Sequence, residues 1–179
     1  MYVIGIAGGT CSGKSTLSDK LGQYYGDNCR VFHMDAYFRK PFIKTIAPIT
    51  GVEYVEHNHP DALLLDEMCN DFYAELNSGK HKVVIIEGLF ALYLPEIRNR
   101  LDLKIFVDLD SDERLVRRIK RFTERGQTFD EITSRYIDTV RFRHNELIEP
   151  TRWHADIVVN GNSGEKTVDI IKTYVDSML

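Results

Sequence analysis

A glycine-rich stretch near the N-terminus constrains this chain more than any other feature: residues 8–15 read Gly-Gly-Thr-Cys-Ser-Gly-Lys-Ser. The spacing matches G-x-x-x-x-G-K-[ST], a loop whose backbone N–H groups surround the phosphates of a nucleotide. An apolar run, Tyr2–Ala7, precedes the loop, and a helix-like segment, Lys14–Tyr25, follows it. The motif requires this strand–loop–helix context, so the sequence predicts a nucleoside triphosphate site. The alternative is a glycine-rich turn that contains an incidental lysine.

The loop residues have separate chemical tasks. Gly8 and Gly13 permit backbone conformations that side chains forbid. We expect Lys14 to reach the β- and γ-phosphates and the Ser15 hydroxyl to bind Mg²⁺, so the predicted cofactors are ATP and Mg²⁺. The predicted nucleotide-binding residues are Gly8, Gly9, Thr10, Cys11, Ser12, Gly13, Lys14, Ser15 and Thr16.

Composition narrows the class of protein. A net charge of −4 over 179 residues argues against a general nucleic-acid binder, and no apolar run is long enough to cross a membrane. The three cysteines show no paired spacing, which indicates a reducing compartment, and we expect the cytoplasm. One of them, Cys11, is either a reactive thiol or a small tolerated residue. The expected partner is a small molecule, and a homo-oligomer stays open.

Apolar runs alternate with amphipathic segments along the whole chain. The runs predict buried parallel strands at Tyr2–Ala7, Arg30–Met34, Lys82–Ile86, Lys104–Leu109 and Ala155–Val159. The amphipathic segments predict helices at Lys14–Tyr25, Ala62–Asn77, Leu94–Arg100, Asp112–Arg125, Phe129–Glu149 and Lys166–Ser177. This alternation predicts an α/β, three-layer fold of the P-loop NTPase type, with a five-stranded, mainly parallel sheet, in one domain over residues 1–179.

Residues 39–60 interrupt the alternation. Three of the five prolines fall in this segment, and it shows no clear period. In an α/β sheet the ligand lies beyond the carboxyl ends of the strands, and this segment follows the second predicted strand. We interpret it as an acceptor-binding loop; the alternative is a surface insertion without a role in binding.

Two carboxylates follow predicted strands. Asp35 could face the γ-phosphate and accept a proton from an acceptor hydroxyl, or contact the Mg²⁺ shell through water. Its alternative is a turn or helix-capping role. Glu87 follows the apolar run of the third strand, a Walker-B-like position for a metal, and its alternative is simple solvation.

Four arginines, Arg114, Arg118, Arg121 and Arg125, are spaced four, three and four residues apart, which places them on one helical face. Like charges at this spacing repel, so an anionic partner is expected. We predict an arginine-bearing helical lid over residues 110–128 that meets the triphosphate. The alternatives are a solvated basic face and an RNA-binding patch.

Other side chains complete the predicted acceptor site. Its aromatic residues either stack on a planar base or pack in the core. His57 and His59 flank Asn58; contact with a substrate hydroxyl, or simple exposure to solvent, is favoured over a zinc pair because no cysteine lies nearby. Asp61 is expected to cap the next helix, and residues 160–164 predict a turn. The predicted substrate-binding residues are Asp35, Tyr37, Phe38, Tyr54, His57, Asn58 and Arg118.

A series of short blocks covers nearly the whole chain: the P-loop, Asp35-Ala36-Tyr37-Phe38, His59-Pro60-Asp61-Ala62, Ile86-Glu87-Gly88, Phe106-Val107-Asp108, Arg117-Arg118-Ile119-Lys120-Arg121, Glu124-Arg125-Gly126 and Glu149-Pro150-Thr151. In content and order they resemble the uridine kinase / phosphoribulokinase family, and most of all its uridine–cytidine kinases. The resemblance implies transfer of the ATP γ-phosphate to the ribose 5′-hydroxyl of a nucleoside, uridine or cytidine being the leading acceptors. It implies Asp35 as general base and Glu87 near the metal. It places Arg118 near the ribose and makes Arg121 and Arg125 lid arginines. The implied catalytic residues are therefore Asp35, Lys14, Arg118, Arg121 and Arg125, and the implied metal residues are Ser15, Glu87 and Asp35.

The chain departs from this pattern in three places. Residues 77–81 cross directly where uridine–cytidine kinases carry a pyrimidine-binding hairpin. His57 and Asn58 stand where the family usually has an aromatic residue and an Asp, and Gln127 replaces a basic lid residue. The shortened form, with Lys40-Pro41 after an aromatic residue, also resembles nicotinamide riboside kinases. Nicotinamide riboside or another small sugar or metabolite alcohol is therefore an alternative acceptor.

An alternative from a different class is a P-loop regulatory switch that hydrolyses nucleotide and binds a partner. The sequence argues against it, because the chain lacks an Asn-Lys-x-Asp guanine box and supplies its own arginine lid.

Overall fold

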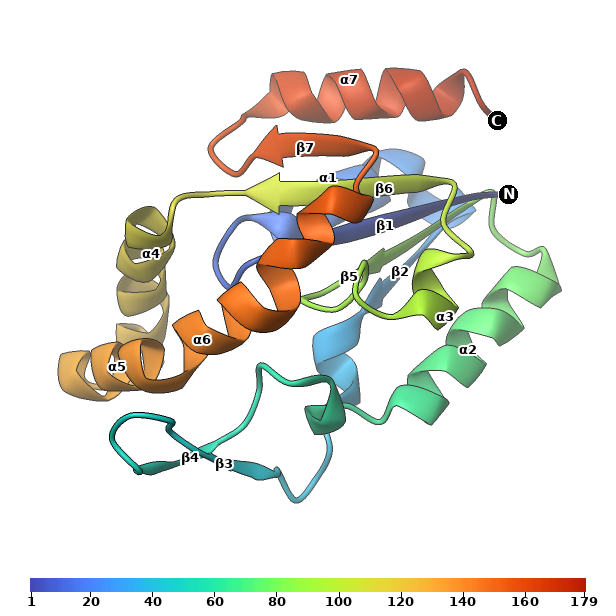
Figure 1. Cartoon of the computed structure of the whole chain (residues 1–179). Coiled ribbons are helices and arrows are strands. Elements are labelled where there is room, and N and C mark those ends of the chain that lie inside the picture. The colour runs from blue at the N-terminus through green and yellow to red at the C-terminus, as the bar shows by residue number, and fades with distance from the viewer.

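A computed structural model describes residues 1–179 and contains a five-stranded parallel sheet (Figure 1). Its strand order is β2-β5-β1-β6-β7, and every neighbouring pair is parallel. The five strands are β1 (Tyr2–Gly8), β2 (Cys29–His33), β5 (Val83–Glu87), β6 (Leu103–Asp108) and β7 (Ile157–Asn160). The sequence prediction of a five-stranded, mainly parallel sheet is confirmed, and each strand lies within two residues of its predicted bounds.

The helices are α1 (Lys14–Tyr25), α2 (Leu65–Ser78), α3 (Pro95–Arg98), α4 (Ser111–Thr123), α5 (Phe129–Arg135), α6 (Arg141–Arg143) and α7 (Glu165–Asp176). The helix predicted over 129–149 is a continuous helical run of several types. A π-helical turn at 136–140 joins α5 to α6, a second at 144–148 follows α6, and a 3₁₀ segment at 149–154 ends the run. None of the helices combines the length and the apolar composition that a bilayer crossing requires.

Helices cover both faces of the sheet, which gives the predicted three layers. On one face, Leu17 and Leu21 of α1 and Ile171 of α7 pack onto β-strand side chains such as Ile4 and Ile105. On the other face, α2, α3 and the end of the long helical run bury a second cluster around Phe72, Ile97 and Ile148. Strands buried on both faces need continuous apolar side chains, which explains the uninterrupted runs in the sequence.

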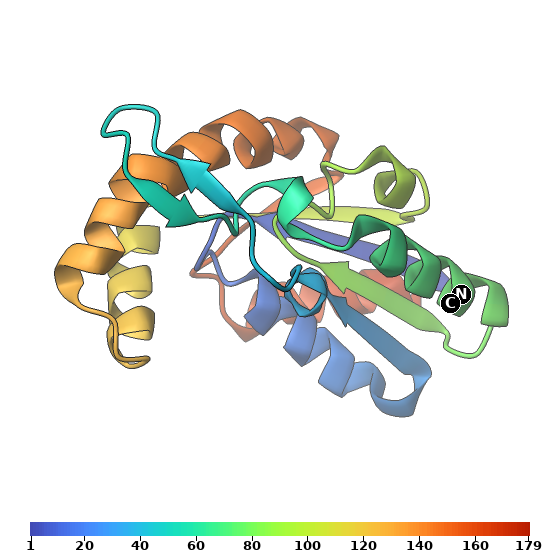
Figure 2. The same cartoon turned by 90° about the horizontal axis from the view of Figure 1, so that it is seen from below.

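The predicted acceptor loop contains structure that the sequence did not reveal. Two short antiparallel strands, β3 (Lys44–Ile46) and β4 (Glu53–Val55), form a hairpin that lies against the long helical run (Figures 1 and 2). The buried Glu56 carboxylate anchors it, because Oε2 accepts a hydrogen bond from Arg143 Nε at 3.1 Å and Oε1 accepts one from the Asn58 N–H. The interpretation as a loose surface insertion is therefore not supported.

The prediction that Asp61 caps the next helix is wrong. Residues 60–62 form a separate 3₁₀ turn, whose cap is the His59 side chain accepting from the Asp61 N–H. The following helix, α2, begins at Leu65 and has no side-chain cap. Because the turn uses Pro60 as its first residue and Phe38 pairs with Leu63 across it, the chain bends before the helix can start.

One buried histidine makes the stability of the folded protein depend on pH. His144 is 7% exposed, and its Nδ1 has no hydrogen-bond partner. Burial, with a smaller contribution from Arg114, lowers the pKa of His144 to about 4, although Glu149 Oε2 lies 3.3 Å from its Nε2. As pH falls below about 6.5, the unfolded chain binds a proton at this position that the folded protein excludes.

We expect the stability contribution of neutral His144 to be complete above pH 6.5 and lost progressively as pH falls to about 4. At pH 5 the loss from this one group should be about 2 kcal/mol. Urea unfolding at pH 7.5 and pH 5 should therefore show a smaller acid loss in His144→Gln than in the unsubstituted protein. The exposed His154→Gln variant serves as the control. An equal acid loss in all three proteins would contradict the assignment.

Candidate active site

Three adjacent strands bring the candidate site residues to one edge of the sheet. The central register pairs Ile6 of β1 with Glu87 of β5, and Glu87 with His33 of β2. The P-loop leaves β1 just beyond this level, and Asp35 follows β2 in a short 3₁₀ turn, Met34–Tyr37. Segments far apart in the sequence thus meet beyond the carboxyl ends of parallel strands, the edge where α/β sheets bind ligands.

The P-loop prepares a site for an anion. Gly13 precedes α1 with a φ of 104°, a conformation that L side chains rarely adopt, and the first turn of α1 contains no acidic residue. Lys14 is 8% exposed and takes part in none of the ion pairs of the protein, and the buried Ser12 hydroxyl has no hydrogen-bond partner. A buried cation at a helix N-terminus is stabilised when a phosphate binds there.

Oxygen ligands for a divalent cation lie beside this loop. The Ser15 hydroxyl is 3.2 Å from both carboxylate oxygens of Glu87, which is 3% exposed. His33 Nδ1 lies 2.9 Å from Glu87 Oε1 and fixes that carboxylate. Hydroxyl and carboxylate oxygens suit Mg²⁺, which takes few protein ligands and completes its shell with phosphate and water. The structure contains no group of three or more His, Cys, Asp or Glu side chains that could hold a metal ion by themselves.

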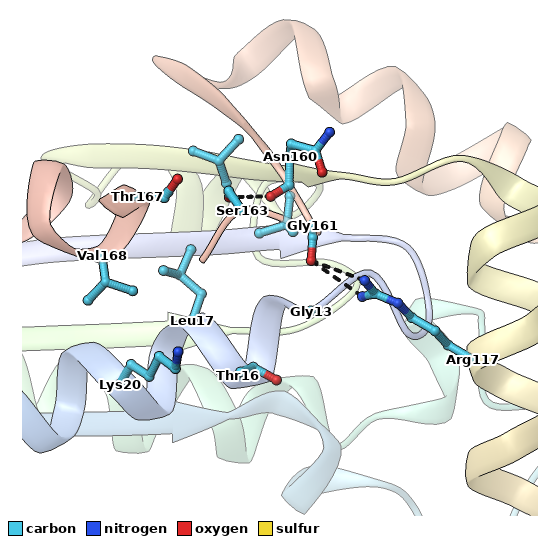
Figure 3. Close-up of a pocket in the computed structure, with 12 residues that line it drawn as sticks. Gly13, Thr16, Leu17, Lys20, Arg117, Asn160, Gly161, Ser163, Thr167 and Val168 are labelled. Carbon is cyan, nitrogen blue, oxygen red and sulfur yellow. Dashed lines mark hydrogen bonds between the residues drawn. The ribbon is translucent and has the colours of Figure 1, made fainter. Parts of the chain in front are cut away.

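A hollow of about 260 Å³ adjoins the P-loop and is drawn in Figure 3. The turn after β7 forms one wall, and the Arg117 guanidinium reaches the Gly161 carbonyl at 3.4 Å (Figure 3). The Gly161 backbone lies so close to the P-loop that a Cβ there would be 2.1 Å from the Ser12 carbonyl oxygen. The sequence predicted a turn at 160–164, and the structure places that turn against the P-loop.

A larger cavity of about 560 Å³ joins the P-loop to the segment after β2. Predicted site residues that line it are Thr10, Cys11, Lys14, Ser15, Asp35, Phe38, His57, Asn58, Arg118, Arg121 and Arg125. Tyr37 and Tyr54 do not line it. The Tyr37 hydroxyl donates to Asp71 at 2.9 Å, and the Tyr54 hydroxyl donates to Asp138 at 2.8 Å. The cavity is therefore lined by the P-loop, by Asp35 and by arginines of the predicted lid. The two tyrosines instead bond carboxylates outside it.

The cavity also includes residues that sequence reasoning did not assign to the site: Lys40, Phe42, Leu89, Phe122 and Arg135. Lys40 and Phe42 lie in the predicted acceptor loop, so their position was a usable signal. Arg135 is an isolated basic residue at the end of α5, and nothing in its local sequence indicates a ligand.

The four arginines predicted to share one helical face lie in different environments. Arg114 lies under the P-loop, 4% exposed, and its Nε donates to the Leu109 carbonyl at 3.0 Å. It does not line the cavity or the P-loop surface beside it, so the structure gives no support to the expectation that it meets the triphosphate. Arg118 is 6% exposed, donates to Thr10 Oγ1 at 3.1 Å and lies over the Phe122 ring at 4.5 Å. Arg121 and Arg125 are exposed and line the cavity.

His57 and His59 serve separate purposes and form no metal pair. The His57 ring packs between two aromatic rings, with centroids 5.1 Å from Phe38 and 5.0 Å from Phe42. Burial, followed by the positive charge of Arg135, lowers the pKa of His57. It is therefore a neutral ring at pH 7, and with its neighbours it forms an aromatic wall beside the cavity.

Comparison with known proteins identifies the family. Residues 74–168 match the model of the phosphoribulokinase / uridine kinase family. The uridine kinase of Lactobacillus helveticus is 32% identical over 203 residues, covering 99% of this chain and 95% of the relative. This chain belongs to that family. The uridine kinase of Deinococcus deserti is 33% identical over 199 residues, covering 97% of this chain and 95% of the relative.

Solved structures agree on the fold. Phosphoribulokinase from Rhodobacter spheroides gives a TM-score of 0.66 at 17% identity, over 89% of this chain and 70% of that one. Shikimate kinase from Acinetobacter baumannii gives a TM-score of 0.57 at 17% identity, over 99% and 94% of the two chains. The sequence-based assignment to this family and to an α/β P-loop fold is thus confirmed.

Gly161→Ala should weaken ATP binding, because its Cβ would collide with the Ser12 carbonyl oxygen and separate the turn from the P-loop. Overpacking of this kind costs about 1–3 kcal/mol, so affinity should fall roughly tenfold to hundredfold. Gly164→Ala is the matched control, since a Cβ there meets nothing within 4 Å. Titration calorimetry with ATP checks this, and equal affinities in the two variants would contradict the placement.

Proposed function

We propose that this protein is an ATP-dependent kinase that transfers the γ-phosphate to the 5′-hydroxyl of a nucleoside, with uridine and cytidine as the leading acceptors. The observation that carries the proposal is the single cavity in which Asp35 and Arg118 share the lining with Lys14 and Ser15 of the P-loop. The names of the relatives support a nucleoside as acceptor.

The residues divide the work of phosphoryl transfer. Lys14 and the N–H groups at the start of α1 hold the phosphates, and Arg121 and Arg125 offset the charge that develops on the transferred group. Ser15 and Glu87 would hold Mg²⁺, which supplies charge neutralisation on the phosphate oxygens when bound. Asp35 accepts the proton of the attacking hydroxyl, and Arg118, fixed by Thr10 and Phe122, orients the acceptor.

The same proposal assigns roles to the segments. Residues 1–179 act as one kinase domain, residues 39–60 bind the acceptor, and residues 110–128 close over the nucleotide as a lid. Gly126, with a φ of 87°, supplies a turn between α4 and α5 about which the lid can move. The three free cysteines favour the reducing cytoplasm as the site of action.

A shorter acceptor site supports nicotinamide riboside, or another small sugar or metabolite alcohol, as the second candidate. The alignment with the Lactobacillus relative extends over 203 residues, more than the 179 of this chain, so that relative carries residues that this chain lacks. Here α2 ends at Ser78 and β5 begins at Val83, with four residues, 79–82, joining them. A pyrimidine-binding hairpin at this position is therefore absent, and the base of the acceptor must be held by other residues.

Asp35→Asn should abolish most of the activity, because a positioned general base contributes about 10²- to 10⁴-fold to the rate. Product formation from ATP, Mg²⁺ and separate acceptors, followed by mass spectrometry, should show a phosphorylated nucleoside whose kcat falls at least a hundredfold in the variant. The control is Asp27→Asn, an exposed carboxylate at the opposite end of β2. Steady hydrolysis without any phosphorylated acceptor, unchanged in Asp35→Asn, would refute the kinase and favour a nucleotide-hydrolysing switch.

A further inference from the structure

Positive charge in the large cavity exceeds what the phosphates of a nucleotide require. A separate hollow of about 250 Å³ lies over the P-loop, with Ser15 and Thr16 in its lining, and we expect the triphosphate there. Lys14 and Arg121 line both this hollow and the large cavity. Four more cations do not line that hollow: Lys40, Arg118, Arg125, and Arg135, which also borders a separate cavity that contains Asp130 and Glu131. All four line the large cavity. Asp35 is the single carboxylate among all its lining residues. The acceptor side of the cavity is therefore strongly cationic.

None of these four cations is neutralised by the protein. The ion pairs of the chain involve other side chains, and Arg118 buries its Nε without any hydrogen-bond partner at 6% exposure. Arg135 is half-buried; its Nη2 donates to the Val55 carbonyl at 3.1 Å, and its guanidinium lies 5.8 Å from the centre of the Tyr54 ring. Lys40 and Arg125 are exposed, whereas the buried charge of Arg118 has no counter-charge. Such a charge is costly, and an anion in the cavity would remove that cost.

The cations also act on one another. Burial is the main cause that lowers the pKa of Arg118, and the neighbouring Arg135 and Arg121 lower it further. Arg135 likewise contributes to the lowered pKa of His57. Arg135 is therefore close enough to both Arg118 and His57 for its charge to act on them.

Two of the four cations come from segments outside the predicted lid. Lys40 comes from the segment after β2 and Arg135 from the end of α5, whereas Arg118 and Arg125 belong to the predicted lid. Phe38, His57 and Phe42 offer flat, uncharged rings beside them. An acceptor that fits this part of the cavity has a planar or sugar ring that packs on the aromatic wall and a negative group that binds the two cations.

We propose that the acceptor carries an anionic group, a carboxylate or a phosphate, bound by Arg135 and Lys40, and that the enzyme prefers such a ribosyl compound to its neutral counterpart. This inference rests on the proposed kinase function and refines its substrate class. Asn58, which lines the same cavity and is neutral, places no negative charge in the way of such a group.

The test compares acceptors that differ by one anionic group: uridine with its 6-carboxylate, nicotinamide riboside with nicotinic acid riboside, and ribulose with ribulose 5-phosphate. Because the 5-hydroxyl of ribulose 5-phosphate is already esterified, the ribulose pair is compared for transfer to the 1-hydroxyl and the two nucleoside pairs for transfer to the 5′-hydroxyl. A charge-assisted hydrogen bond is worth enough to raise kcat/KM for the anionic member roughly tenfold or more. In Arg135→Gln and in Lys40→Gln this ratio should shrink, mainly through a higher KM for the anionic member. Arg141→Gln, an exposed arginine on the same helical run that does not line the cavity, should keep the ratio.

Each outcome decides the inference. A preference confined to the ribulose pair identifies phosphate as the group, and one confined to the other pairs identifies carboxylate. Phosphorylation of the neutral members at equal or higher kcat/KM, unchanged in both variants, would overturn the anionic acceptor while leaving the kinase function intact. A preference that persists in both variants would overturn the assignment to Arg135 and Lys40. Absence of any phosphorylated product from all six acceptors would refute the proposed function itself, and this inference with it.

Discussion

The parallel register of three strands is the constraint on which the site depends. Ile6, Glu87 and His33 lie at one level across β1, β5 and β2, so the segments that leave these strands must meet. The strands β1 and β5 are buried along their whole length. A one-residue slip would turn each of their side chains to the opposite face and would force the core on both faces to repack. The sheet core therefore fixes the spacing between the P-loop, Asp35 and Glu87 before any ligand binds.

The site is built from charges that the protein leaves without partners. Lys14 is nearly buried and unpaired, Arg118 buries an unbonded Nε, and the exposed lid arginines face the same cavity. Two buried carboxylates, by contrast, are held by the protein: Glu87 accepts a hydrogen bond from Ser15 and lies 2.9 Å from His33, and Glu56 accepts one from Arg143. The folded protein thus carries a local excess of positive charge that costs stability and that anionic substrates relieve.

Local patterns made much of the fold predictable. Both predicted bounds of helix α1 are correct, and the loop motif dictates where this helix starts. The apolar runs located all five strands of the sheet. The β3–β4 hairpin was missed, since its strands are three residues each and depend on contacts with Asp138 and Arg143, more than eighty residues away. Arg135 was missed for the same reason: only the folded chain brings it to the cavity. Tyr37 and Tyr54 show the converse, since each is near the site in sequence but bonds a carboxylate elsewhere.

A crystal structure of the complex with Mg²⁺, a non-hydrolysable ATP analogue and the acceptor identified by product formation tests the central claim most directly. The account predicts the triphosphate on Lys14 and Ser15, the base beside Gly161, and the acceptor hydroxyl in the large cavity, hydrogen-bonded to Asp35 and directed at the γ-phosphate. An acceptor bound outside that cavity, or a hydroxyl directed away from both Asp35 and the γ-phosphate, would contradict it.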